Sequence, residues 1–388
     1  MPEGSTLKVK IVLAVSSIIF ILICLEIGLR LLGMNSADMK DTDIKTGLRT
    51  FAPNSSIKYG TSCFSNVIVT NSRGFHSPEF SIEKPKDVKR IVIVGDSFVE
   101  SAQVPIEKSF WHILEQRLNT DGSGIRYEVI PFGIGGNGTL ANFDYLVSYG
   151  LQYAPDLVIN EYNPGDTNND AEVSDFDERL RRIIDKLDNQ STIAQQPVLT
   201  TREYVDGLIK SFAKRSSLIV TLYSKYLAVK SRSQSTGDLT SGKIYDIYER
   251  TFYERPDQET ENAWIRQSKT LESMNRAVEA KGAKFLLVSS ADAPRVPPLR
   301  DSFIAHFSKP EDIVLDEPER RLQRIADVGV FSFFQMLPIF HERVEREGAK
   351  DLSWSCDSHY NETGNAWTAD ALFDYLQQHP DLLKIEHI

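Results

Sequence analysis

The chain has 388 residues, with 44 Lys and Arg against 54 Asp and Glu, and a formal net charge of −10 at pH 7. This length suits one enzyme-sized domain with further segments attached. The basic residues are scattered along the sequence instead of gathered into a stripe, which argues against nucleic acid as a partner.

Residues 11–33 are almost entirely apolar. A helix needs roughly 20 apolar residues to cross a bilayer, so this segment predicts a transmembrane anchor. A cleavable signal peptide is the alternative, but it requires a shorter apolar core and a small-residue cleavage site, which the residues after Leu32 do not clearly offer. Because Lys8 and Lys10 precede the apolar run, we expect residues 1–10 to be a cytoplasmic tail and the rest to lie in the periplasm or outside the cell.

Residues 34–89 are polar and rich in turn signals, and we interpret them as a stalk that becomes a packed lead-in to the main domain. The chain has three cysteines, Cys24 within the anchor, Cys63 and Cys356. An oxidising compartment would permit a disulfide between Cys63 and Cys356. Two unpaired thiols are the alternative, and the sequence leaves both open.

From residue 90 onwards, short apolar runs alternate with helical patterns, which is typical of a parallel sheet with helices on both faces. A charged and polar stretch, about residues 170–261, interrupts this rhythm and predicts a helical insertion or a cap. The expected strands are 90–95, 127–132, 156–162, 284–288 and 328–334. The expected helices are 107–119, 139–150, 263–281, 317–326 and 365–377.

The first strand opens directly onto the sequence GDSF at 95–98. A serine at the carboxyl end of a parallel strand projects into the crevice where such sheets bind ligands. Because a free hydroxyl is a poor nucleophile, Ser97 needs a base and a carboxylate to orient that base. His359 and Asp357, with one residue between them before the last helix, suit those roles. The alternative is an ordinary turn and a surface histidine.

With these motifs the chain resembles the SGNH hydrolases, or GDSL-type esterases, and specifically their membrane-anchored bacterial members found with glycan metabolism. GDSF at 95–98 matches the block that carries the nucleophile, and DSHYN at 357–361 resembles the Asp-x-His-x-Asn variant of the last block. FGIGGNGT at 132–139 resembles the block whose glycine supplies an oxyanion-hole amide, with Gly136 as the best match. The resemblance implies a flavodoxin-like, three-layer α/β/α fold for residues 90–388.

One block departs from the family pattern. The family has Asn followed by Asp after its third strand, with the Asn as an oxyanion donor, whereas residues 163–168 read NPGDTN. Without a gap the donor position falls on Gly165 or Asp166, and an ionised carboxylate there would repel the oxyanion. We expect Asn163, or else Asn168, to replace the missing donor.

No cofactor is expected. The glycine-rich run at 135–138 lacks the lysine and the spacing of a phosphate-binding loop, and Asp357 and His359 have no second cluster of metal ligands in the sequence. The sequence therefore predicts an exported serine esterase that acts on acyl, chiefly acetyl, esters of a glycan or related carbohydrate. A glycan O-acyltransferase with the same acyl-enzyme and a non-catalytic glycan-binding protein are the alternatives.

Overall fold

The computed structural model describes residues 3–31, 40–43, 46–122, 124–189, 216, 218–219 and 248–383. At its centre is a five-stranded sheet with the order β6-β5-β7-β8-β9, in which every neighbouring pair is parallel. Counted from β5 this is the flavodoxin-like order 2-1-3-4-5, so the predicted fold class is confirmed. The strands are β5 (Val88–Gly95), β6 (Arg126–Gly133), β7 (Leu157–Tyr162), β8 (Lys284–Ser289) and β9 (Ser332–Gln335).

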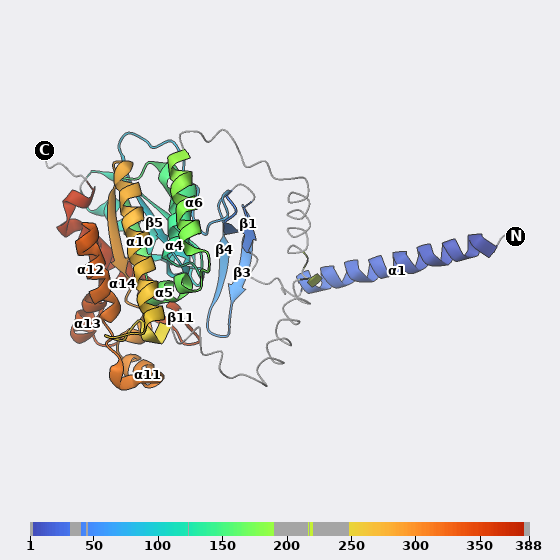
Figure 1. Ribbon diagram of the computed structural model, residues 1–388. Coiled ribbons are helices and arrows are strands. Elements are labelled where there is room, and N and C mark those ends of the chain that lie inside the picture. Colours follow the sequence, from blue (N-terminus) through green and yellow to red (C-terminus); the bar gives the residue numbers. More distant parts are fainter. Residues whose placement is uncertain are drawn as a thin grey trace.

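The apolar runs form strands because both faces of the sheet are covered by helices (Figure 1). Alternate residues of β5 point to opposite faces, with Ile91 and Ile93 in one core and Val92 and Val94 in the other. The first core is closed by α3 (Phe110–Thr120), α13 (Met336–Glu347) and α14 (Glu362–Gln378). The second is closed by α4 (Thr139–Tyr145), α6 (Phe176–Asn189), α10 (Gln258–Ala280) and α12 (Glu317–Gly329).

Shorter helices connect these elements. Three of them are α2 (Ser97–Glu100), α5 (Pro164–Ala171) and α11 (Arg300–Ala305). Single turns of 3-10 helix are η1 (Ile106–Lys108), η3 (Leu151–Tyr153), η5 (Ala293–Arg295), η6 (Pro310–Asp312) and η7 (Pro380–Leu383), and η2 (Leu146–Gly150) is a π turn.

Several predicted elements differ from the structure at their ends. The helix expected at 263–281 begins at Gln258, because the Asp257 side chain caps it by accepting a hydrogen bond from the Thr260 amide at 3.0 Å. The strand expected at 328–334 is only Ser332–Gln335, since α12 continues to Gly329 and ends at Val330 in the left-handed conformation. The expected helix 139–150 is divided between α4 and the π turn η2.

Part of the predicted insertion belongs to the main core. Phe176, Leu180 and Ile183 of α6 are buried in the same cluster as residues of α4 and α10. Apart from residues 216 and 218–219, the stretch 190–247 lies outside the described residues, so the cap over the site stays a prediction.

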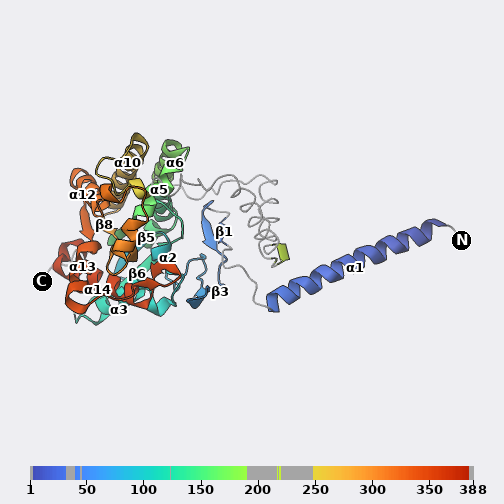
Figure 2. The same cartoon turned by 90° about the horizontal axis from the view of Figure 1, so that it is seen from below.

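At the N-terminus, α1 (Glu3–Leu31) projects away from the sheet and its helices in both views (Figures 1 and 2). Its segment Val12–Leu29 has a mean hydropathy of 2.7 and is not buried. Within the described residues it is the one helix long and apolar enough to cross a bilayer. Length and composition alone also fit a signal sequence.

The residues after α1 form two antiparallel hairpins, which lie on the side of the domain that carries α2 (Figure 2). One pairs β1 (Lys40–Thr42) with β2 (Arg49–Phe51), and the other pairs β3 (Ser56–Gly60) with β4 (Ser65–Val69). Phe51 and Ile68 from these hairpins pack with Ala102, which follows α2. A disulfide joins Cys63, in the β3–β4 turn, to Cys356. The β3–β4 hairpin is therefore tied to the chain segment immediately before Asp357.

Candidate active site

Ser97 is the first residue of α2, directly beyond the carboxyl end of β5. The turn is tight because Gly95 has no side chain: a Cβ there would lie 2.3 Å from a Val99 methyl and 2.8 Å from a Glu161 carboxylate oxygen. Asp96 caps the helix by accepting a hydrogen bond from the Phe98 amide at 2.9 Å. These contacts hold the Ser97 side chain at the edge of the sheet where ligands bind in this class of fold.

The three residues predicted to act together do meet. Ser97 Oγ lies 2.7 Å from His359 Nε2, although the two residues are 262 positions apart in the sequence. His359 Nδ1 is hydrogen-bonded to Asp357 Oδ1, and the same oxygen accepts the His359 backbone amide at 2.9 Å. When Nδ1 carries the proton, Nε2 is free to accept the hydroxyl proton of Ser97.

Asp357 and His359 were expected on a loop, but they lie on β11 (Asp357–Tyr360), which pairs antiparallel with β10 (Ser353–Trp354). This strand is held at both ends. Before it, Cys356 is bonded to Cys63. After it, Asn361 caps α14 by accepting hydrogen bonds from the two amides of Thr363 and Gly364, at 2.8 and 3.0 Å. The side-chain amide of Asn361 also donates to two backbone carbonyls of the preceding turn, those of residues 351 and 353. The imidazole is thus positioned by the backbone around it.

The local charges favour an ionised Asp357 and a basic His359. Burial lowers the pKa of His359, but the hydrogen bond and the charge of Asp357, with smaller effects of Asp96 and Glu100, raise this pKa above its usual value. Burial raises the pKa of Asp357, yet its hydrogen bonds with His359 and Gln103 bring this pKa below its usual value. The pair therefore resembles a carboxylate that orients a base.

The loop after β6 contains a tight turn, residues 134–137, which we call the oxyanion turn. The Asn137 amide donates to the Ile134 carbonyl at 3.1 Å, and Gly136 has a φ of +81°. Positive φ at the third residue of the turn is the signature of a type II turn, which is why glycine is favoured there. A Cβ on Gly135 would lie 3.3 Å from Ser97 Cβ, so the turn contacts the nucleophile.

Asn163, the expected replacement donor, is the N-cap residue of α5. Its Oδ1 accepts the Gly165 amide at 2.8 Å, and its Nδ2 donates to Asp96 Oδ2 at 2.7 Å. One side-chain N–H thus serves Asp96, which itself lies 3.4 Å from Ser97 Oγ. The second N–H is the group that a role in the oxyanion hole would require.

Asp166, at which the sequence suggested an ionised carboxylate, lies buried. Its side chain is fully buried, at 0% exposure. Burial, followed by the nearby charges of Asp96, Glu161 and Asp170, raises the pKa of Asp166 well above its usual value. This environment favours the neutral form of the Asp166 carboxyl, which would repel an oxyanion less than an ionised carboxylate does. Asn168, the other suggested donor, is buried in the same helix.

Three further polar residues contact the site and were not predicted. Glu100 accepts the Gly135 amide at 2.6 Å and pairs with Lys40 at 2.6 Å. Arg49 Nη2 donates to the Gly135 carbonyl at 3.2 Å. Glu100 lies one helical turn after Ser97, which is a signal in the sequence. Lys40 and Arg49 carry no such signal, because only the folding of the β1–β2 hairpin brings them to Gly135.

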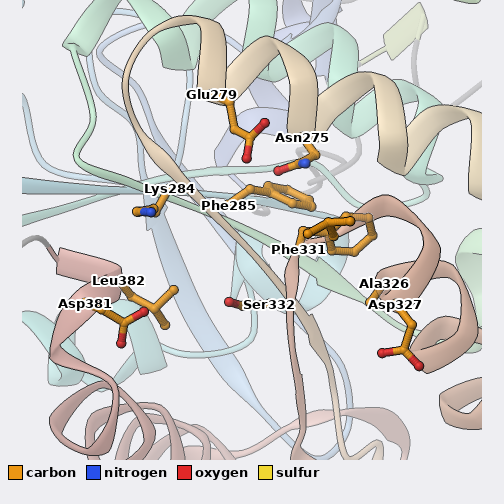
Figure 3. A pocket seen from close by; sticks show the side chains of 11 residues that line it. Asn275, Glu279, Lys284, Phe285, Ala326, Asp327, Phe331, Ser332, Asp381 and Leu382 are labelled. Carbon is orange, nitrogen blue, oxygen red and sulfur yellow. The ribbon is translucent and has the colours of Figure 1, made fainter.

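A pocket of about 420 Å³ lies elsewhere, between α10, α12 and the start of two strands (Figure 3). Lys284 and Ser332, the first residues of β8 and β9, line it. It is therefore at the amino end of the sheet, opposite Ser97. In the described part of the chain, no group of three or more His, Cys, Asp or Glu residues is arranged to hold a metal ion.

No protein-family model and no curated protein matches this chain. Among solved structures, it is similar to the acetyl xylan esterase AlAXEase, at 14% identity over 74% of this chain and 99% of that one, with a TM-score of 0.39. It is also similar to TesA, at 12% identity over 75% and 99%, with a TM-score of 0.39. A third is Axe2, an acetylxylan esterase from Geobacillus stearothermophilus, at 12% identity over 77% and 95%, with a TM-score of 0.40. These values are too low to transfer a function to this chain.

The geometry predicts a pH dependence. If His359 must be neutral to accept the Ser97 proton, kcat/KM should fall on the acidic side with an apparent pKa above the ordinary histidine value of about 6.5, since the environment raises the His359 pKa. Asp357→Asn removes the largest influence that raises this pKa, so the acidic limb should move to lower pH while kcat falls on the order of 10²–10⁴-fold. Rate measurements from pH 5 to 9 test this. An acidic limb at the same pH in both proteins would contradict it.

Proposed function

We propose that this chain is a serine esterase of the SGNH type, which removes an acyl group, chiefly acetyl, from a glycan or related carbohydrate. The observation that carries the proposal is the 2.7 Å contact between Ser97 Oγ and His359 Nε2, with Asp357 on the other ring nitrogen. This is the arrangement that activates a serine hydroxyl. The carbohydrate substrate rests on the family resemblance of the sequence motifs.

In the proposed reaction, Ser97 Oγ attacks the ester carbonyl while its proton passes to His359 Nε2. The backbone amides of Ser97 and Gly136 bind the oxyanion of the tetrahedral intermediate, and the second side-chain N–H of Asn163 adds a donor. The intermediate collapses, the carbon–oxygen bond to the sugar breaks, and His359 returns the proton to the leaving alcohol. An acyl group then remains on Ser97.

Water completes the cycle. His359 accepts a proton from the water as its oxygen attacks the acyl carbonyl, and the second intermediate releases the acid and restores the Ser97 hydroxyl. Asp357 keeps the imidazole in the required orientation and stabilises its protonated form in both halves. A sugar hydroxyl in place of water would make the same acyl-enzyme a transferase.

The direct test uses nitrophenyl acetate, with and without acceptor oligosaccharides. The wild-type protein should release nitrophenol and acetate, and Ser97→Ala should lower kcat at least about 10³-fold. Ser65→Ala, at an exposed position of β4, is the matched control and should keep wild-type activity. Transfer of the acetyl group to an oligosaccharide with little hydrolysis would identify an acyltransferase. A folded wild-type protein with no turnover would contradict both.

For localisation, we propose that α1 anchors the protein with its N-terminus in the cytoplasm and the domain in the periplasm or outside the cell. Lys8 and Lys10 before the apolar segment support this orientation. The disulfide between Cys63 and Cys356 suits an oxidising compartment.

Two measurements test the localisation. A phosphatase reporter fused to the C-terminus should be active, because this enzyme works only after export. Non-reducing peptide mapping of protein purified from cells should recover the peptides of Cys63 and Cys356 cross-linked. A silent phosphatase together with an active cytoplasmic reporter at the same point would contradict the orientation. Alkylation of both thiols in the native protein would contradict the disulfide.

A further inference from the structure

The β1–β2 hairpin carries two cationic side chains, Lys40 and Arg49, that lie beside the oxyanion turn. Arg49 Nη2 lies 3.2 Å from the Gly135 carbonyl oxygen, and Lys40 Nζ lies 2.6 Å from a Glu100 oxygen. The same Glu100 oxygen accepts the Gly135 amide at 2.6 Å. Both polar backbone groups of Gly135 are thus held by charged side chains.

The orientation of one peptide bond in this turn decides where the Gly136 amide points. Type I and type II turns differ by a flip of their central peptide, here the bond between Gly135 and Gly136. Because both central residues are glycine, neither side chain opposes the flip. The turn alone therefore does not secure the direction of the Gly136 N–H.

Arg49 fixes the orientation of the peptide bond between Gly135 and Gly136. In a planar trans peptide the carbonyl oxygen and the following N–H point in opposite directions. A guanidinium that holds the Gly135 oxygen consequently keeps the Gly136 N–H on the other side of the same peptide. Because the bond is charge-assisted, it also polarises the peptide and strengthens the N–H as a donor.

Glu100 holds the backbone amide of Gly135 by accepting its hydrogen bond. Its side chain is 6% exposed, and Lys40, with a side-chain exposure of 10%, provides the opposite charge that such a buried carboxylate requires. Since Glu100 belongs to α2 together with Ser97, this contact joins the helix of the nucleophile to the oxyanion turn. Relative movement of the two proposed oxyanion amides is thereby restricted.

Arg49 itself is held through its backbone. It pairs with Thr42 in the hairpin, and the Tyr145 hydroxyl of α4 donates to its carbonyl at 2.5 Å. Its side chain is exposed, whereas the next two residues of β2 are buried. Replacing the guanidinium therefore leaves no cavity in the core.

We propose that Arg49, assisted by the Lys40–Glu100 pair, is a positioning residue that keeps the Gly136 amide directed at the oxyanion. This role rests on the proposed function, in which Gly136 is an oxyanion donor. It also means that the esterase domain depends on a segment that precedes its first parallel strand.

Steady-state kinetics of the full chain with nitrophenyl acetate test the proposal. Arg49→Ala should lower kcat about 10- to 100-fold and change KM less than about twofold. This decrease in kcat should not exceed the decrease that removal of an oxyanion donor causes. Arg49→Lys retains a cationic donor and should keep an intermediate kcat. Guanidinium ion at low millimolar concentration should partly restore Arg49→Ala, whereas methylammonium should do so less. Lys58→Ala, an exposed cation on β3, is the control and should match the wild type.

The outcomes separate this role from a structural one. Two results would overturn the positioning role while leaving the esterase proposal intact. One is an unchanged kcat in Arg49→Ala. The other is a loss of kcat that guanidinium does not restore and that accompanies a lower melting temperature. An inactive wild type together with an inactive Lys58→Ala would instead overturn the proposed function, and the role of Arg49 with it.

Discussion

The hydrogen bond between Ser97 and His359 is the contact on which the rest of the site depends. It joins residues 262 positions apart, and it requires the first strand of the sheet and the segment before the last helix to end at the same edge. The parallel order of the strands provides that edge, because all carboxyl ends point one way. The Cys63–Cys356 disulfide and the Asn361 cap then fix strand β11, which brings His359 to this edge.

The lead-in residues are better understood as part of the site than as a spacer. The β1–β2 hairpin contributes the contacts of Lys40 and Arg49, and the β3–β4 turn contributes Cys63. These contacts end at α2, at the oxyanion turn and directly before β11, and each of these three elements carries a residue proposed for catalysis. Since these hairpins have few core residues of their own, they are ordered mainly by packing on the domain. The two hairpins and the residues proposed for catalysis therefore depend on each other.

The sequence alone predicts the parts of the structure that have local causes. Strand β5 and the turn at Ser97 follow from an apolar run and a glycine, and the positions of Asp357 and His359 follow from one short motif before a capped helix. The contacts of Arg49 and Lys40 have no local cause. The burial of Asp166, which raises the pKa of its carboxyl, depends on residues distant in the chain, so residue type alone does not predict it. The start of α10 was missed because the Asp257 cap lies before the apolar pattern begins.

The central claim is that His359 activates Ser97 for covalent attack, and active-site labelling tests it most directly. A fluorophosphonate probe should form a covalent bond with the folded wild-type protein, and peptide mass spectrometry should place the label on Ser97. His359→Ala should nearly abolish labelling, because without the base the hydroxyl remains protonated. Labelling of a different serine, or equal labelling of wild type and His359→Ala, would contradict the account.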